Sequence, residues 1–386
     1  MFQANARLAA TIALFWLALG SPGYGQTPFA KWCSDGSVSP DFIVEPTRYT
    51  IEGATFIAGD FNGDGLTDFL VYRPQDGLFA KWYSTDPGSC SEFLYRDVRY
   101  TYPNAQVYVG DFNGDGLSDV LIYHPEDGAF VKFYADPRLE AFYSPDFIYQ
   151  VARVTVPHAE MHLGDFNGDG ITDVLVYRPS DGLWAKWYGT GSVGPDFAYQ
   201  QVRYTRTNSQ IVTGDFNGDG LTDVVVYDPN HGGVLGDFMK WYSTPGIGPD
   251  FTYLGGQYTI TDGRMYAGDF NGDGLTDILM YRWGDGYLAK WYSGSYGPDF
   301  LYQEARVVHA PGYLVTGDFD GDGLTDVVFA GIDLNWPFRA FFEKWYSQPE
   351  ISPDFNWQPR VYRGLRVLAT GDFKGDGTTD LLVSAQ

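Results

Sequence analysis

Residues 214–223 read Gly-Asp-Phe-Asn-Gly-Asp-Gly-Leu-Thr-Asp, and this segment recurs seven times along the chain with few changes. Successive copies are separated by 49 to 54 residues. A unit of about 50 residues is the size of one blade of a β-propeller. The repeat therefore predicts an all-β fold, a single seven-bladed β-propeller, although 386 residues would ordinarily suggest about two or three domains.

One copy of the repeat shows what a blade contains. Residues 161–165 form a short apolar run that enters the loop, and residues 174–177 form a β-branched run that leaves it. After a Pro- and Gly-containing turn, residues 183–188 and 196–204 supply two more strands. Each repeat is thus expected to make four antiparallel strands.

The two ends of the chain are out of phase with this unit. Residues 29–32 and 40–42 resemble third and fourth strands, whereas residues 381–384 follow the last loop as a second strand. We therefore expect residues 26–386 to form one propeller, in which residues 28–50 complete the blade of residues 365–386. Such closure removes the exposed edges that an open array would leave.

The first 25 residues differ from the rest. Arg7 precedes the apolar stretch 8–19, and small and turn-forming residues occupy 20–25. This is the layout of a secretory signal peptide and is too short for a membrane span. We expect residues 1–25 to be removed and the protein to be secreted, or to enter the lumen of the secretory pathway or a periplasm.

Cysteine usage and charge fit that expectation. Cys33 and Cys90 are the two cysteines of the chain, and the blade register puts them in neighbouring blades, where a disulfide is plausible. The formal net charge is −24, yet the seven loops hold 22 of the 49 acidic residues. The acidity indicates metal ligation, and a nucleic-acid partner is not expected. The sequence carries no signal for an oligomeric state.

Each loop supplies oxygen ligands at fixed positions, which we number 1 to 9 from its first aspartate. Positions 1, 3, 5 and 9 offer side-chain oxygens, and position 7 offers a backbone carbonyl, a set suited to Ca²⁺. Glycines at positions 4 and 6 allow the tight turn. The sequence predicts six to seven structural calcium ions, held by Asp60, Asn62, Asp64, Leu66, Asp68, Asp111, Asn113, Asp115, Leu117, Asp119, Asp165, Asn167, Asp169, Ile171, Asp173, Asp215, Asn217, Asp219, Leu221, Asp223, Asp269, Asn271, Asp273, Leu275, Asp277, Asp318, Asp320, Asp322, Leu324, Asp326, Asp372, Asp376, Thr378 and Asp380.

Two loops depart from the pattern at position 3. Asp320 adds a negative charge to the sixth loop and should tighten binding there. Lys374 removes a ligand from the seventh loop and introduces a positive charge. The seventh site is expected to be the weakest or empty.

The motif resembles the FG-GAP or VCBS repeat, found in the integrin α-subunit propeller and in many secreted bacterial and fungal proteins. The resemblance covers essentially the whole chain after residue 25. It implies calcium loops on a propeller and leaves function open, because relatives of this class include lectins, adhesion domains and polysaccharide lyases.

A second repeated feature is a lysine in each third strand. Each blade also carries an acid directly before the phenylalanine that opens its fourth strand. We expect a cross-strand ion pair beside an aromatic ring, with a ring of seven Lys-Trp binding sites as the alternative. The lysines are Lys31, Lys81, Lys132, Lys186, Lys240, Lys290 and Lys344, and the acids are Asp41, Glu92, Asp146, Asp196, Asp250, Asp299 and Asp354.

Function is more plausible where the blades differ, on the face opposite the calcium loops. Two enlarged connections, 228–238 and 331–342, lie there, and arginines or a histidine end several second strands, where a turn ion pair is the plainer alternative. First strands could also present side chains toward the axis. The ligand-binding candidates are Asp228, His231, Asp237, Asp333, Asn335, Trp336, Arg339, Arg73, His124, Arg178, Arg282, Tyr108, His162 and Tyr266.

No nucleophile elbow, zinc signature, phosphate loop or dinucleotide fingerprint is present in the sequence. The leading hypothesis is a ligand-binding module, with carbohydrate or another small molecule as the partner. The alternatives are a pocket enzyme, such as a polysaccharide lyase or a cyclase of the Diels–Alder type, and a protein-interaction or adhesion scaffold. Whether the chain is an enzyme stays open, and no catalytic residue is assigned.

Overall fold

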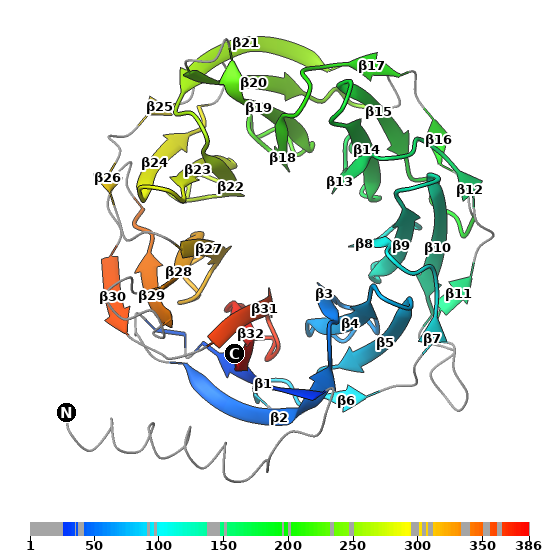
Figure 1. Ribbon diagram of the computed structural model, residues 1–386, viewed down its shortest axis with the longest axis vertical. Helices are drawn as coiled ribbons and strands as arrows, with labels where there is room; N and C mark the ends of the chain where they lie inside the picture. The colour runs from blue at the N-terminus through cyan, green and yellow to red at the C-terminus, as the bar shows by residue number, and fades with distance from the viewer. Residues whose placement is uncertain are drawn as a thin grey trace.

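The computed structural model describes residues 26–385 except 35, 38–41, 91–92, 96–98, 137–146, 150–152, 195–196, 200–201, 232–234, 247–250, 295–300, 303–305, 308–311, 333–339, 350–355 and 361–364. The predicted signal peptide therefore lies outside the described residues. Seven separate antiparallel sheets stand around a common axis (Figure 1). The chain is all-β and a seven-bladed propeller, as the repeat predicts.

Strand order is the same in every blade, from the axis outward. The innermost strands are β3 (Thr55–Gly59), β8 (Gln106–Gly110), β13 (Glu160–Gly164), β18 (Gln210–Gly214), β22 (Arg264–Gly268), β27 (Gly312–Gly317) and β31 (Leu365–Gly371). The second strands are β4 (Asp68–Arg73), β9 (Asp119–His124), β14 (Asp173–Arg178), β19 (Asp223–His231), β23 (Asp277–Arg282), β28 (Asp326–Ile332) and β32 (Asp380–Ala385). The third strands are β5 (Leu78–Tyr83), β10 (Ala129–Ala135), β15 (Leu183–Tyr188), β20 (Leu235–Tyr242), β24 (Tyr287–Tyr292), β29 (Ala340–Tyr346) and β1 (Gln26–Cys33).

The outer edge of the blades is less uniform than the rest. Three blades have one outer strand, namely β21 (Thr252–Thr259), β30 (Asn356–Arg360) and β2 (Ile43–Ile51). In the other four blades two short strands pair with the third strand, namely β6 (Leu94–Tyr95) with β7 (Arg99–Tyr100), β11 (Phe147–Tyr149) with β12 (Arg153–Val154), β16 (Ala198–Tyr199) with β17 (Arg203–Tyr204), and β25 (Leu301–Tyr302) with β26 (Arg306–Val307). The single strand expected over 196–204 is one of these divided cases.

The last blade is built from both ends of the chain. Its sheet has the order β2-β1-β32-β31, so the N-terminal strands add to the C-terminal pair. The register joins Phe29 to Ser384 and Trp32 to Leu381. The predicted closure of the ring is confirmed, and Figure 1 shows β1 and β2 beside β32 and β31 in this blade.

Each sheet is buried on both faces by the neighbouring blades. Second strands such as β14 therefore contain a continuous apolar run, residues 174–177, instead of alternating apolar and polar residues, and every residue of β14 except Arg178 is buried. Seven buried clusters are found among the described residues, one at each blade-to-blade interface. In one of them Leu382 of the last blade packs with Phe69 of the first.

Neighbouring calcium-type loops are joined by a backbone hydrogen bond at all seven interfaces. The N–H of position 8 donates to the carbonyl of position 1 in the preceding loop at 2.5 to 2.7 Å, for example Thr222 to Asp165. The side chain at position 8 also lies against the glycine that precedes that aspartate. A Cβ on Gly164 would come within 2.3 Å of Thr222. The invariant glycine of the repeat therefore serves contact between blades.

Because of this contact, a methyl group added at Gly164 should lower the stability of the protein. Gly164→Ala is expected to destabilise the protein by about 1–3 kcal/mol, because the Thr222 side chain must move within a packed interface. Gly294→Ala is the matched control, since nothing lies within 4 Å of its Cβ position. Urea denaturation of the two variants checks this, and equal midpoints would contradict the packing role of Gly164.

Candidate functional site

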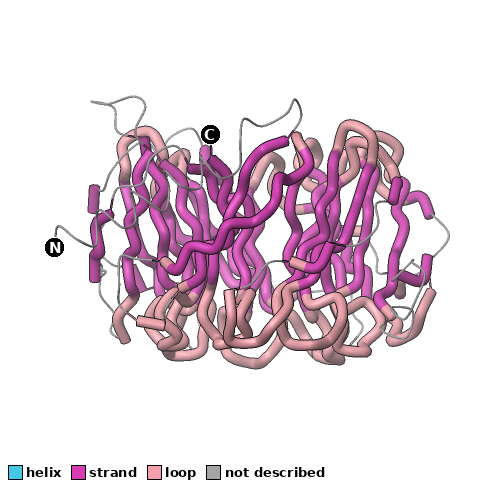
Figure 2. The backbone as a smooth tube through the Cα atoms, turned by 90° about the horizontal axis from the view of Figure 1, so that it is seen from below, coloured by secondary structure: helices cyan, strands magenta, loops and turns pink. Residues whose placement is uncertain are grey.

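The loops between first and second strands lie along one rim of the ring, and the turns between second and third strands lie along the other (Figure 2). In the first loop, the Asp60 carboxylate accepts the N–H groups of Gly63 and Gly65 at 2.7 and 2.9 Å. Asp64 accepts the N–H of Leu66 at 2.8 Å. These bonds orient the side-chain oxygens of one tight turn, and the same bonds recur in the other loops.

The aspartate at position 9 begins each second strand and is buried. Asp68 accepts N–H groups from Phe61 and Ser84, at 3.1 and 2.8 Å. Burial raises the pKa of Asp68 to about 7 against these bonds, and the charges of Asp64 and Asp60 add to the rise. The equivalent aspartates show the same direction, to about 7 or 8, at Asp119, Asp173, Asp223, Asp277, Asp326 and Asp380. Clustered carboxylates with raised pKa values are a site at which a cation is favourable.

The sixth loop shows the convergence most clearly. Carboxylate oxygens of Asp318, Asp320 and Asp326 lie within 4.8 Å of one another. Burial, followed by the charge of Asp322, raises the pKa of Asp320. An all-oxygen donor set of this kind fits a hard cation such as Ca²⁺. The residues of the sixth loop therefore fit the ion that the sequence predicts, and the sites of the first five loops stay a prediction.

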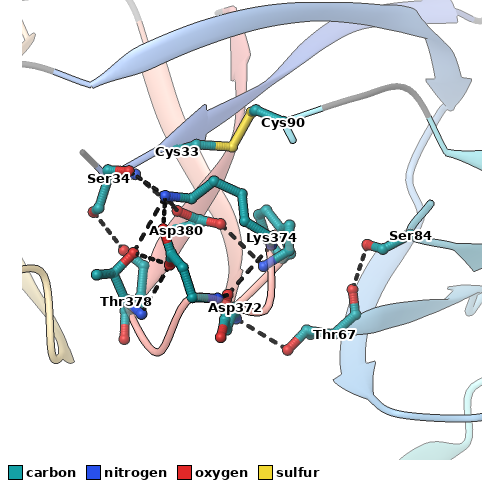
Figure 3. Close-up of a disulfide and its surroundings, with 12 residues drawn as sticks. Cys33, Ser34, Thr67, Ser84, Cys90, Asp372, Lys374, Thr378 and Asp380 are labelled. Atoms are coloured by element: carbon teal, nitrogen blue, oxygen red, sulfur yellow. Dashed lines mark hydrogen bonds and ion pairs between the residues drawn. A yellow bond between two sulfur atoms is a disulfide. The ribbon is translucent and has the colours of Figure 1, made fainter. Parts of the chain in front are cut away.

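The seventh loop does not fit in the same way (Figure 3). The ammonium group of Lys374 donates to the Asp376 carboxylate at 2.5 Å and to the backbone carbonyl of Ser34. It also lies 3.9 Å from the buried carboxylate of Asp380. The ammonium group of Lys374 thus places a positive charge among the oxygens of the seventh loop.

The seven repeated lysines are buried, with exposed fractions from 0 to 4%. The ammonium groups of Lys132 and Lys186 lie 3.4 and 3.5 Å from the ring centroids of Phe197 and Phe251, each in the next blade. The alternative of seven accessible Lys-Trp binding sites is therefore wrong, because the lysines pack inside the blade interfaces. The acids expected to pair with them lie outside the described residues.

The arginines that end second strands form the turn ion pairs that we gave as the plainer alternative. Arg73 binds Asp76 through two bonds, of 2.9 and 2.6 Å. Arg178 with Asp181 and Arg282 with Asp285 repeat this geometry. In the second blade, His124 takes the place of the arginine, and its Nδ1 lies 2.8 Å from Asp127.

Exposed tyrosines stand beside two of these pairs and an exposed tryptophan follows the arginine of a third, and none of these aromatic residues was among the predicted site residues. Tyr100 and Tyr204 are each 67% exposed and occupy equivalent places, since Tyr100 pairs with Leu78 and Tyr204 with Leu183. The bond to Asp76 raises the pKa of Arg73, and Tyr100 is close enough to contribute as well. Trp283, 63% exposed, follows Arg282 directly. In a chain with 18% aromatic residues, none of the three stands out in the sequence.

The enlarged connections are described in part. Arg206, which was not a candidate, binds Asp228 at 3.2 Å and Asp237 at 2.7 Å, so it joins two predicted residues. His231 ends β19, and its side chain lies outside the described part of the chain. The candidates Asp333, Asn335, Trp336 and Arg339 also lie outside the described residues.

The candidates near the axis have different surroundings. The Tyr108 hydroxyl donates to Gln106 at 2.6 Å and accepts the N–H of Met161 in the next blade at 3.3 Å. The Tyr266 hydroxyl likewise accepts the N–H of Leu314. These two tyrosines therefore connect neighbouring innermost strands.

His162 differs from these tyrosines. Burial lowers the pKa of His162 to about 4, and its Nε2 has no hydrogen-bond partner among the described residues. Glu160 lies 3.9 Å from it, on the same strand.

Comparison with known proteins agrees with the fold. Residues 165–226 match the FG-GAP-like repeat family. A lectin from Agrocybe aegerita, solved for its recognition of non-reducing terminal N-acetylglucosamine, is similar with a TM-score of 0.60 and 13% identity over 95% of this chain and 96% of the lectin. BBS1N in complex with ARL6DN is similar with a TM-score of 0.52 and 9% identity, over 93% and 97% of the two chains.

A protein from Lactobacillus plantarum is similar with a TM-score of 0.51 and 10% identity, over 90% of this chain and 96% of its own. No curated protein matches the sequence. Within the described residues, no helix has the length and apolar character to cross a membrane. Its seven antiparallel sheets make the chain a seven-bladed β-propeller, and residues 165–226 of it match the FG-GAP-like repeat family.

Proposed function

We propose that this protein is a secreted, calcium-stabilised binding module that holds carbohydrate on the face opposite the calcium loops. The observation that carries the proposal is the repeated cluster of an exposed tyrosine beside a fixed Arg-Asp pair, in the first and third blades. The disulfide between Cys33 and Cys90 fits an extracellular location. The similarity to a lectin at 13% identity is consistent with the proposal.

The chemistry of the cluster suits a sugar. Asp76 holds the Arg73 guanidinium through two bonds, which leaves further N–H groups for hydroxyl oxygens. Side chains of Arg73 and Asp76 are 30% and 40% exposed, so both are within reach of a ligand. An exposed ring such as Tyr100 offers an apolar face to the C–H side of a pyranose. Binding to a preformed cluster also loses little side-chain entropy.

An isolated exposed aromatic is normal on a protein surface. Two features favour a binding role for these tyrosines. Tyr100 and Tyr204 occupy equivalent register positions, and the same kind of Arg-Asp pair lies beside each. Arg178 and Asp181 are 25% and 41% exposed, close to the values in the first blade. The two clusters therefore predict two equivalent sites in one chain.

Substitution of the tyrosines tests these sites. A glycan array identifies the sugar, and calorimetry then counts the sites and measures affinity. Tyr100→Ala and Tyr204→Ala should each weaken binding at one site by about 10- to 30-fold. The double variant should lose binding at both sites. Val193→Ala, which alters another exposed apolar side chain, is the control and should leave binding unchanged.

The alternatives predict different results. One ligand per chain, lost in Arg206→Ala but kept in the tyrosine variants, would replace this proposal with a single pocket at the fourth blade, as an enzyme requires. Absence of sugar binding together with capture of a protein at the same face would support an adhesion scaffold instead.

A further inference from the structure

The seventh loop departs from the other six at two positions, not one. Position 3 is Lys374 where the others have asparagine or aspartate, and position 7 is Thr378 where the others have leucine or isoleucine. The second change introduces a hydroxyl group beside the first. The Thr378 Oγ1 donates to Asp376 at 2.6 Å and lies 3.4 Å from the Lys374 ammonium. The two departures therefore belong to one arrangement.

The ammonium group of Lys374 is surrounded by the oxygens that remain in the loop (Figure 3). Its neighbours are Asp376 at position 5, Thr378 at position 7 and Asp380 at position 9, with the Ser34 carbonyl as a fourth oxygen. Lys374 is only 5% exposed. A buried ammonium group is stable only when carboxylates and hydrogen bonds compensate it, and this loop supplies both. The group thus has the surroundings that the other loops offer to a metal ion.

The seventh loop lies where the N-terminal strand joins the C-terminal strands. Ser34 follows β1, the N-terminal strand that completes the last blade, so the bond from Lys374 ties the N-terminal strand to the C-terminal loop. The preceding residue, Cys33, forms a disulfide with Cys90 of the first blade. Gly88 of the first blade also donates its N–H to the Lys374 carbonyl at 2.6 Å. Covalent and hydrogen bonds that need no metal thus hold the junction between the two ends of the chain.

We propose that Lys374 is a tethered cation that takes the place of calcium in the seventh loop, so that ring closure is independent of the metal. This proposal rests on the calcium role proposed for the other loops. Six ions per chain follow from it. Loss of calcium would then loosen the first six loops before the closing blade.

Counting bound calcium tests the replacement. Equilibrium dialysis followed by elemental analysis should give six ions per chain for the wild type. The double variant Lys374→Asn/Thr378→Leu restores the pattern of the other loops and should bind seven. Seven ions in the wild type, or six in the double variant, would overturn the proposal.

Melting in EDTA tests the tethered charge without any metal. Lys374→Met is expected to lower the melting temperature in EDTA, and Lys374→Arg, which keeps the charge, should recover at least half of the loss. Equal melting temperatures for wild type and Lys374→Met would refute the role of the ammonium group. Because this readout contains no calcium, it stands even if the wild type binds no ions, a result that would contradict only the calcium proposal.

Discussion

Removing calcium is expected to lower the melting temperature of the ring by on the order of 20 °C, the largest effect that the structure predicts. Each ion bound only to the folded state adds about 2.7 kcal/mol when its concentration is 100 times its dissociation constant. Six loops of this kind are spread around one cooperative ring, and backbone hydrogen bonds link neighbouring loops. Calorimetric scans with excess calcium and with EDTA measure the difference.

The aspartates at position 9 give this prediction a dependence on pH. In the metal-free protein their pKa values are raised, for example to about 7 at Asp173, above the ordinary value of an unfolded chain. The folded state therefore binds more protons than the unfolded state between about pH 4 and pH 7. Stability of the metal-free protein should rise as the pH falls through 7, whereas calcium affinity should fall because protons compete for the same oxygens.

A single-loop variant provides the control. Asp165→Asn removes one charged ligand from the third loop and should weaken one calcium site. With calcium present, its melting temperature should fall by less than chelation lowers that of the wild type. In EDTA, its melting temperature should change little. Melting curves that do not change after thorough chelation, at pH 8 where competition from protons is weakest, would contradict a structural role for the ions.

The propeller was predictable because its decisive signals are local and repeated. The seven loops, the β-branched runs such as 174–177 and the unmatched strands at the two ends are all visible in the sequence, and together they define the ring and its closure. The register of the blades made a disulfide between Cys33 and Cys90 plausible but left the pairing open, and the structure contains the bond.

What the sequence concealed depends on contacts between blades. The glycine before each loop aspartate looks like part of a turn, yet Gly164 is needed because Thr222 of the next blade lies against it. Lys132 was expected to lie beside an aromatic ring, but the sequence did not show that it is buried against Phe197 of the next blade. Tyr100 and Tyr204 carried no signal, because only the completed register sets them beside an Arg-Asp pair.

Breaking the disulfide is expected to have the second largest effect, a fall in melting temperature of on the order of 5 °C with calcium present. Cys33 and Cys90 are 57 residues apart in sequence, and a cross-link over that span stabilises a protein by about 4 kcal/mol in the chain-entropy estimate. The bond joins the last blade to the first, so its loss should act on ring closure. Cys33→Ser/Cys90→Ser and reduction of the wild type should give the same shift, and reduction should not affect the double variant.

Hydrogen exchange locates the weakened element. Amides that pair β1 with β32, between Phe29 and Trp32, should lose protection first in the reduced protein, while those of β14 in the third blade should keep it. Lys374 acts on the same junction through Ser34, so Lys374→Met combined with Cys33→Ser/Cys90→Ser should deviate from additivity. Additive losses of melting temperature, or a uniform loss of protection around the ring, would contradict this role. The disulfide would then stabilise all blades alike, and the β1–β32 pairing alone would close the ring.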